Sequence, residues 1–432
     1  MPRDTIFAPA SGSGKAAIAI VRISGPKTRF VLETIAGSLP KPRQATLRVL
    51  NGPDGAIDRA LIVWFPAPHS FTGEDCAEFH LHGSMAIVRA LLACLALFDD
   101  CRLARPGEFA RRAFEHGKMD LSAVEGLADL IDSETERQRK QALRQMEGGL
   151  SLRVAEWRQS LLSAMALVES DIDFSDEGDI EPETARHARR FIQHLITDIE
   201  QVLATARQGQ RLRDGIVVVV AGPPNAGKST LVNALAYRDI AIVSAIAGTT
   251  RDLIEVPLDL DGLPVTLIDT AGLRDSSDEI ERQGIARARQ RVSQSDLGLW
   301  LMPPGFDDQP PAGPDWIRIR TKADLGVHEH DGLAISVLTG DGMERLREVL
   351  RQEIGQRLGS GDALITRERQ NQALTRAMQA LSQALKGLKQ DGDTELIAED
   401  LRLAARHFGE IIGVVGVEAM LDTLFAQFCI GK

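Results

Sequence analysis

The chain has 432 residues, of which 44% are hydrophobic, and it carries a formal net charge of -11 at pH 7. This length exceeds what one hydrophobic core supports and predicts two or three domains. The negative charge argues against a general polyanion binder, so contact with nucleic acid has to use local basic patches or a partner's surface. The most apolar run, residues 90–98, is far too short to span a membrane.

The N-terminus and the cysteines indicate the cellular compartment. The N-terminus lacks the hydrophobic core of a signal peptide. The cysteines are spaced neither as a zinc site nor as a disulfide framework: Cys76, Cys94, Cys101 and Cys429. We therefore expect a cytoplasmic protein without membrane attachment.

The first 117 residues mix strand and helix patterns. β-branched residues and alternating apolar positions predict short strands, and helical spacing predicts one helix after them. The expected strands cover residues 17–23, 59–64 and 77–82, and the expected helix lies near residues 86–98. This region is therefore expected to be an α+β domain.

Helical patterns begin near Met119 and continue to about Arg213. Strands then alternate with helices over 215–357, which predicts a parallel sheet with crossover helices. A helical pattern returns over 358–432. Because each helical block has an apolar stripe that must be buried, we expect the two blocks to pack together, with the α/β part inserted between them.

Residues 222–229, Gly-Pro-Pro-Asn-Ala-Gly-Lys-Ser, match the phosphate-binding loop of P-loop nucleotide hydrolases. The strand-like run 216–221 precedes the loop and a helical segment follows it, which is the setting that this motif requires. Backbone N–H groups can surround phosphate oxygens here, Lys228 can reach the β and γ phosphates, and Ser229 can place its hydroxyl on Mg²⁺. The sequence therefore predicts a nucleotide site.

Two later segments supply groups that are expected beside the phosphates. In residues 248–252, Thr250 is the expected second protein ligand of Mg²⁺ and a sensor of the γ phosphate. A predicted strand over 264–268 then delivers Asp269, which can hold the metal through water. The N–H of Gly272 can contact the γ phosphate and turn away when that phosphate leaves.

Residues 321–324, Thr-Lys-Ala-Asp, follow a predicted strand over 316–320 and indicate the base. The carboxylate of Asp324 can accept both donors on the Watson–Crick edge of guanine, which favours GTP over ATP. Such hydrolases usually have asparagine at the position of Thr321. A hydroxyl cannot supply both the donor and the acceptor of an amide, so we expect weaker affinity for guanine.

The sequence indicates less clearly which residue orients the attacking water. Ras-like hydrolases use a glutamine after the segment that corresponds to residues 269–272, whereas this chain has Leu273 there. Glu281 lies a short distance further along and offers a carboxylate. From the residues alone, a surface glutamate is the simpler interpretation of Glu281.

These motifs and both ends of the chain resemble the MnmE (TrmE) family of tRNA-modification GTPases over essentially the whole sequence. Outside the nucleotide motifs, the resemblance rests on residues 19–25, 70–75, 105–110 and 428–432. It implies a multidomain fold with an α+β N-terminal folate-binding and dimerisation domain, a discontinuous α-helical domain and an inserted Ras-like α/β P-loop GTPase domain. The expected boundaries are 1–117 for the N-terminal domain, 118–214 and 358–432 for the helical parts, and 215–357 for the GTPase domain.

The resemblance also implies an activity. It implies a K⁺-activated GTPase that forms a homodimer and acts on tRNA with the FAD-containing partner MnmG. The pair would form 5-carboxymethylaminomethyl or aminomethyl uridine at the wobble position from methylene-tetrahydrofolate, and GTP hydrolysis would drive movement of the GTPase domain. The alternative is a ribosome-assembly switch of the Era or Der type. The KH domain of the former and the second GTPase domain of the latter are not visible in the sequence.

For the folate derivative, methylene- or formyl-tetrahydrofolate, the resemblance implies contacts by Arg22, Glu78, Lys118 and Lys432. Glu78 can accept from the amino group of the pterin, while Arg22 and the lysines can meet carboxylates.

For K⁺, the resemblance implies coordination by Asn225 and by backbone carbonyls at Ser244, Ile246 and Thr249. The ion would supply the positive charge that an arginine finger provides elsewhere. The resemblance also aligns Glu281 with the glutamate that positions water. We therefore expect Glu281, Lys228 and Thr250 to act in catalysis, and Ser229 and Thr250 to hold Mg²⁺. The residues expected to bind GTP are Asn225, Ala226, Gly227, Lys228, Ser229, Thr230, Ser244, Ala245, Ile246, Ala247, Gly248, Thr249, Thr250, Asp269, Thr270, Ala271, Gly272, Thr321, Lys322 and Asp324.

Overall fold

The structure, a computed structural model, describes residues 4–12, 14–173, 182–238, 254–269, 295–326, 333–390, 392–415, 418–426, 428 and 430–431. The chain forms two compact units. The first consists of Met1–Ala128, Ser151–Ala155 and Arg406–Lys432, and the second of Asp129–Leu150 and Glu156–Ala405. The four-segment division expected from the sequence stays a prediction.

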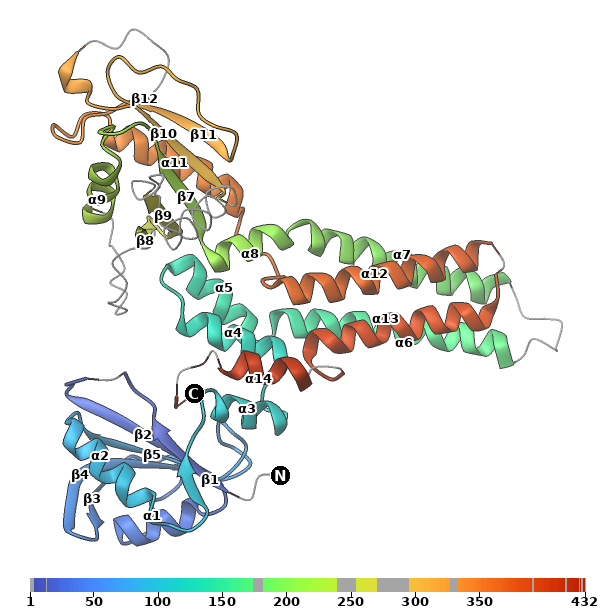
Figure 1. The fold of residues 1–432 in the computed structure, drawn as a ribbon. Helices are drawn as coiled ribbons and strands as arrows, with labels where there is room; N and C mark the ends of the chain where they lie inside the picture. Colours follow the sequence, from blue (N-terminus) through green and yellow to red (C-terminus); the bar gives the residue numbers. More distant parts are fainter. Residues whose placement is uncertain are drawn as a thin grey trace, which may run out of the picture. The chain divides into compact units, whose positions relative to one another are not determined.

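Among the described residues of the first unit, six strands form one sheet in the order β3-β4-β5-β2-β1-β6 (Figure 1). Neighbouring strands are antiparallel except β1 and β6, which run parallel. The strands are β1 (Thr5–Pro9), β2 (Ile18–Ser24), β3 (Thr46–Gly52), β4 (Gly55–Phe65), β5 (Cys76–His82) and β6 (Cys101–Leu103). The three strands predicted in this region are confirmed as β2, β4 and β5.

The two faces of this sheet differ because side chains alternate along each strand. On one face, residues such as Phe79 are buried against helices α1 (Thr28–Ala36) and α2 (Met85–Leu95). The predicted helix near residues 86–98 is confirmed as α2. The opposite face, called here the open face, exposes apolar side chains across β2, β3 and β4: Ile18 (59%), Leu47 (47%), Val49 (45%) and Leu61 (44%).

At the β1 side of the sheet, the second face is covered by helix α3 (Glu108–Glu115) and the loop before β5. Phe109 of α3 and Phe71 of that loop pack with Ile6 of β1. Helices α4 (Leu121–Ile131) and α14 (Glu418–Ala426) pack on the far side of α3. Gly107 precedes α3 at φ 66°, and a Cβ there would lie 2.5 Å from the carbonyl oxygen of Phe425, so only glycine permits this close approach.

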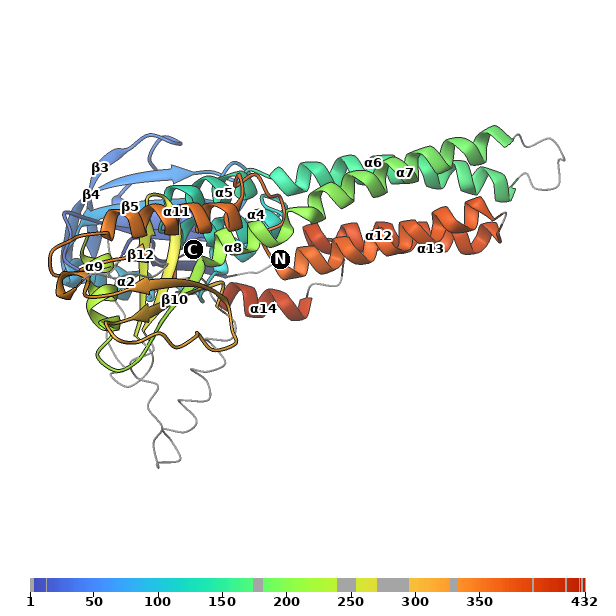
Figure 2. The same cartoon turned by 90° about the horizontal axis from the view of Figure 1, so that it is seen from above.

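In the second unit, long helices run side by side in both views (Figures 1 and 2). They are α7 (Pro182–Ala204), α12 (Glu368–Lys389) and most of α6 (Gly149–Asp173) and α13 (Thr394–Ile412), whose residues 151–155 and 406–412 belong to the first unit. Trp157 Nε1 of α6 donates to Asp198 of α7 at 2.6 Å, and Arg402 of α13 pairs with Glu169 of α6 at 3.2 Å. Helix α7 packs against α12. The expectation that the helical blocks on either side of the α/β part pack together is therefore confirmed.

The α/β part of the second unit contains a sheet in the order β12-β11-β10-β7-β9-β8. Strands β12, β11, β10, β7 and β9 are parallel, and β8 is antiparallel to β9. The elements are β7 (Ile216–Ala221), α9 (Lys228–Arg238), β8 (Ile254–Leu260), β9 (Leu263–Asp269), β10 (Leu297–Met302), β11 (Asp315–Arg320), the 3₁₀ turn η2 (Ala323–Leu325), β12 (Leu333–Ala334) and α11 (Met343–Leu358). The predicted strands at residues 216–221, 264–268 and 316–320 are confirmed.

The expectation of a parallel sheet whose strands alternate with helices is wrong at two described connections: β8 and β9 form an antiparallel hairpin, and β10 passes to β11 without a helix. Residues 303–314 join the parallel strands β10 and β11 without a helix. The segment contains five prolines, and proline both removes a backbone donor and clashes with the preceding helical turn. Aromatic contacts lie beside it instead, with the Trp300 ring centroid 5.8 Å from that of Trp316 and 6.3 Å from that of Phe306.

Two further helices, α5 (Glu136–Met146) and α8 (Ala206–Asp214), lie where the chain enters the α/β part. A Cβ at Gly209 of α8 would lie 2.1 Å from the carbonyl oxygen of Ile365, so α8 directly contacts the segment that follows α11. No helix in the described part of the chain is long and apolar enough to cross a membrane.

Candidate functional site

The predicted phosphate loop begins where β7 ends, at the carboxyl edge of the parallel strands. Nucleotide sites of open α/β sheets lie at this edge. Val220 of β7 pairs with Asp269 of β9, so the end of β9 reaches the same place. Gly222 has φ 152°, and a Cβ there would lie 2.5 Å from the carbonyl oxygen of Leu301. The loop can therefore pass close to β10 only with glycine at this position.

The polar groups of the loop lie as the sequence predicts. Lys228 Nζ donates to the carbonyl oxygens of Gly222 at 2.9 Å and Pro223 at 3.0 Å, which holds its ammonium over the loop. Ser229 Oγ donates to Asp269 Oδ2 at 2.6 Å. Two oxygen ligands of the kind that Mg²⁺ prefers are thus adjacent, one from the start of α9 and one from the end of β9.

Asn225 is an exposed residue of the loop and has φ 61°. Asparagine tolerates this left-handed conformation better than most residues, because its short polar side chain can bond locally. The amide of Asn225 is therefore available to a ligand at the surface of the loop.

The predicted base-recognition segment, residues 321–324, follows β11 at the same edge of the sheet. Lys322 has φ 57°, and Thr321 N donates to the carbonyl oxygen of Met302 at 3.0 Å. Ser336 Oγ donates to Asp324 Oδ1 at 2.6 Å, which orients the exposed carboxylate. Ser336 lies two residues after the end of β12. The sequence did not single out this serine, although its place after the last strand was a possible signal.

Several predicted residues lie outside the described residues. These are the catalytic Glu281, the nucleotide and ion contacts Ser244, Ala245, Ile246, Ala247, Gly248, Thr249, Thr250, Thr270, Ala271 and Gly272, and the C-terminal Cys429 and Lys432. Their assignments stay predictions.

The first unit brings two of the predicted folate residues into direct contact. Arg22 of β2 and Glu78 of β5 are cross-strand neighbours, and Arg22 Nη2 donates to Glu78 Oε1 at 2.8 Å. The guanidinium of Arg22 also lies 5.2 Å from the ring centroid of Phe71 and 5.8 Å from that of Phe109. Because the two side chains bond directly, a molecule that reaches one of them here also meets the other, and they do not lie at separate ends of a ligand site.

The third described folate residue, Lys118, lies near the same loop. A Cβ placed on Gly73 would be 3.2 Å from Lys118 Cε, so the lysine stem lies against the segment that carries Phe71. Arg22, Glu78 and Lys118 are thus gathered around residues 70–75, which connect to β5. A thiol in this area is inert, because burial raises the pKa of Cys76 to about 12.

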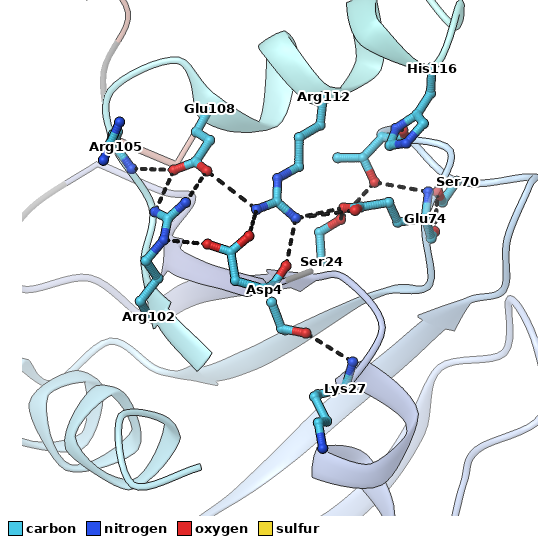
Figure 3. A network of polar contacts seen from close by, with 12 residues as sticks. Asp4, Ser24, Lys27, Ser70, Glu74, Arg102, Arg105, Glu108, Arg112 and His116 are labelled. Atoms are coloured by element: carbon cyan, nitrogen blue, oxygen red, sulfur yellow. Dashed lines mark hydrogen bonds and ion pairs between the residues drawn. The ribbon is translucent and has the colours of Figure 1, made fainter. Parts of the chain in front are cut away.

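The main residue that sequence reasoning missed is Arg112, which is 1% exposed. It bonds to Asp4, Glu74 and Glu108, and Arg102 bonds to Asp4 and Glu108 beside it (Figure 3). We call this set the Arg112 network. Glu74 and Glu108 belong to two of the motifs that carried the family resemblance. Arg112 itself lies among the charged residues of α3, where the local sequence does not distinguish a buried arginine from a surface one.

Burial and the neighbouring arginines act in opposite directions on the acids of this network. Burial would raise the pKa of Asp4, but the hydrogen bond and charge of Arg102, with the charge of Arg112, lower it below its ordinary value. Burial would likewise raise the pKa of Glu108, but Arg102 and the backbone N–H of Arg105 outweigh it and lower that pKa. Both acids are therefore ionised at neutral pH.

Comparison with known families and proteins covers almost the whole chain. A family model described as GTP-binding protein TrmE N-terminus matches residues 5–118, and one described as MnmE helical domain matches residues 121–429. A tRNA modification GTPase MnmE of Beijerinckia indica subsp. indica is 52% identical over 436 residues, which cover 99% of this chain and 96% of that protein. One of Methylobacterium sp. (strain 4-46) is 52% identical over 438 residues, covering 99% and 100%.

Solved structures give a much weaker likeness. A point variant of Aquifex aeolicus Era bound to GDP.AlF4- is 24% identical over 38% of this chain and 66% of that chain, with a TM-score of 0.26, which is too low to bear on fold or function. The two family models and the full-length relatives are sufficient to assign the family without the solved structures. The chain belongs to the MnmE family of tRNA modification GTPases.

Proposed function

We propose that the chain hydrolyses GTP to GDP and phosphate. The observation that carries this proposal is the arrangement at the carboxyl edge of the second sheet. There Ser229 bonds to Asp269 at 2.6 Å at the phosphate end, and Asp324 is oriented by Ser336 at the base end. Lys228 and the loop amides would neutralise the phosphates, and Asp324 would select guanine. Ser229, with Thr250, would hold Mg²⁺, which would offset charge on the β and γ phosphates.

K⁺ would bind at Asn225 and at the carbonyls of Ser244, Ile246 and Thr249, and would supply positive charge to the transition state. The exposed amide of Asn225 supports this, because carbonyl and amide oxygens suit a hard cation. Glu281 would accept a hydrogen bond from the attacking water and so orient it.

We further propose that hydrolysis gates modification of the tRNA wobble uridine with the FAD-containing partner MnmG. The name of the full-length relatives, tRNA modification GTPase, supports the substrate class. A tetrahydrofolate derivative, the source of the one-carbon unit, would lie at Arg22, Glu78, Lys118 and Lys432. The described groups fit it, since Arg22 offers an aromatic-flanked cation and Glu78 a partly buried acceptor. No feature of the described residues favours the Era or Der alternative.

Steady-state hydrolysis tests the nucleotide assignment. GTP and ATP should be compared in K⁺ and in Na⁺ at equal ionic strength, for the wild type and for Glu281→Gln. We expect fast GTP turnover only for the wild type in K⁺. Equal rates in both salts would contradict the K⁺ site, and faster ATP turnover would contradict the role of Asp324.

Calorimetry with formyl-tetrahydrofolate tests the folate site. We expect heat of binding for the wild type and none for Arg22→Ala. Unchanged binding by the variant would refute the site. The cytoplasmic location stays a prediction.

A further inference from the structure

Arg112 joins three segments of the first unit that are far apart in sequence. Its guanidinium donates to Asp4 Oδ1 and to the Asp4 carbonyl oxygen at 3.0 Å, to Glu74 at 3.1 Å and to Glu108 Oε1 at 3.3 Å. These partners come from the segment before β1, from the loop of residues 70–75, and from the start of α3. Arginine suits such a place, because its rigid fork of donors can bond several carboxylates in fixed directions.

Glu74 extends this network to the strand that carries Arg22. Glu74 Oε2 accepts from Ser24 Oγ at 2.8 Å, and Ser24 Oγ lies 2.7 Å from Thr72 Oγ1. Ser24 is on β2 two residues after Arg22, so the two side chains share a face of the sheet. Glu74 therefore fixes residues 70–75 against the edge of the proposed folate site.

The Arg112 network also positions the two aromatic rings beside Arg22. Phe71 lies in the loop that Glu74 holds, and Phe109 lies on α3 three residues before Arg112. Both rings lie within about 6 Å of the Arg22 guanidinium, a range in which a cation and a ring attract each other. The direction of the Arg22 guanidinium thus depends on two segments that Arg112 ties together.

We propose that Arg112 is a positioning residue for the ligand site at Arg22 and Glu78. It holds residues 70–75 and α3 so that Phe71 and Phe109 fix the Arg22 guanidinium beside Glu78. This inference rests on the proposed folate function of the first unit. Arg112 touches no ligand in this scheme, and it acts through Glu74 and the two rings.

The competing explanation is that Arg112 only stabilises the fold. The presence of a buried ion pair does not decide this, because such pairs can raise or lower stability. The two roles differ in what a variant changes. A stabilising residue lowers the melting temperature without changing ligand affinity well below that temperature. A positioning residue weakens affinity in a protein that is still folded.

The test uses full-length Arg112→Lys and Glu74→Gln, with Asp58→Asn as the matched control. Asp58 is another carboxylate of the same unit with a nearly buried side chain, and it bonds to the backbone N–H of His82 at 2.9 Å and to its ring at 2.8 Å. The measurements are calorimetric affinity for formyl-tetrahydrofolate, melting temperature, and hydrogen exchange of residues 70–75 without ligand.

We expect Arg112→Lys and Glu74→Gln to weaken binding at least about tenfold and to speed exchange in residues 70–75. Asp58→Asn should lower the melting temperature and leave the ligand affinity and the hydrogen exchange of residues 70–75 unchanged. Wild-type affinity in both network variants, or equal losses in all three variants, would overturn the proposal. Absence of binding by the wild type would refute the folate function itself, and the exchange of residues 70–75 would then decide whether Arg112 holds the loop.

Discussion

Single side chains set the properties of the base end of the nucleotide site. Thr321 is 5% exposed, and its hydroxyl has no hydrogen-bond partner among the described residues. An unpaired buried hydroxyl costs about 1–3 kcal/mol. A bound guanine offers acceptors that would relieve this cost, but a hydroxyl replaces only part of an asparagine amide. We therefore expect Thr321 to limit affinity for guanine while still favouring a bound base.

We expect Thr321→Asn to tighten GDP binding about fivefold, because one additional hydrogen bond is worth about 1 kcal/mol. Competition with a fluorescent guanine nucleotide measures this change. Thr321→Val is the matched control, since it keeps the shape and removes the hydroxyl, and it should bind more weakly than the wild type. Three equal affinities would mean that this position does not contact the base.

The acids around Arg102 predict a dependence of stability on pH. Asp4 bonds to Arg102 at 2.5 Å, and Glu108 bonds to it at 2.5 and 2.8 Å. Their pKa values are lower in the folded state than in the unfolded chain. Their ion pairs therefore stabilise the fold above the ordinary carboxylate pKa of about 4, and the contribution disappears as the pH falls through the lowered values.

Arg102→Met should accordingly lower the melting temperature at pH 7 and lose this difference from the wild type towards about pH 3, where the carboxylates become protonated. Thermal unfolding across that range checks the expectation. Arg105→Met serves as the control, because the exposed Arg105 side chain forms no ion pair among the described residues. If the melting temperatures of Arg102→Met and the wild type differ by the same amount at every pH, this expectation is contradicted.

Among the elements, α5 occupies the junction where the chain enters and leaves the α/β part. Three glutamines on one face donate to backbone carbonyls: Gln138 to Arg213 at 3.0 Å, Gln141 to Gly209 at 3.3 Å, and Gln145 to Leu364. Arg213 lies near the end of α8 before β7, whereas Leu364 follows α11. The carboxylate of Asp129 accepts from Arg213 at 3.0 Å and from Arg367 at 2.5 Å. One junction therefore holds both connections of the α/β part.

Asp129→Asn should loosen both connections, because it leaves two partly buried guanidinium groups without their carboxylate. We expect hydrogen exchange in residues 205–215 and 359–367 to rise about tenfold, a loss of about 1.4 kcal/mol of local stability. Asp132→Asn is the control, since Asp132 lines a polar cavity together with Asp129 and forms no ion pair in the described part of the chain. If these residues exchange hydrogen at the same rate in Asp129→Asn and Asp132→Asn, the proposed role of Asp129 is contradicted.

At the level of the whole molecule, the open face of the first sheet offers an apolar surface to the homodimer that the family resemblance implies. Leu47, Val49 and Leu61 expose apolar groups on one face of the neighbouring strands β3 and β4, and Ile18 does so on β2, on the other side of β5. An exposed apolar patch such as that on β3 and β4 is a candidate interaction site. A second copy would cover this surface and would also approach Arg22 and Glu78, which lie on the same face.

We expect Leu61→Lys to prevent formation of the homodimer that the family resemblance implies, because burying an unpaired ammonium at an interface is unfavourable. Sedimentation velocity at several protein concentrations measures the change. Leu97→Lys is the control, since Leu97 is 68% exposed and follows α2 on the other side of the sheet. Dimers that persist in Leu61→Lys would place the interface elsewhere.

Features that depend on short, contiguous segments were predictable before any coordinates. The phosphate loop, Asp269, Asp324 and the strands before them belong to this class, because glycine conformations, β-branched runs and fixed spacings act within a few residues. The absence of a helix between β10 and β11 was not foreseen, although the prolines of residues 303–314 carried the reason locally.

The contacts between distant residues, in contrast, followed from the tertiary structure alone. Arg22 bonds to Glu78 across 56 residues, Arg112 to Asp4 across 108, and Arg367 to Asp129 across 238. Such pairs depend on strand register, on which face of a helix is buried, and on where the chain leaves and re-enters a unit. A local pattern contains none of these, so a buried arginine such as Arg112 looks in sequence like any charged residue on a helix surface.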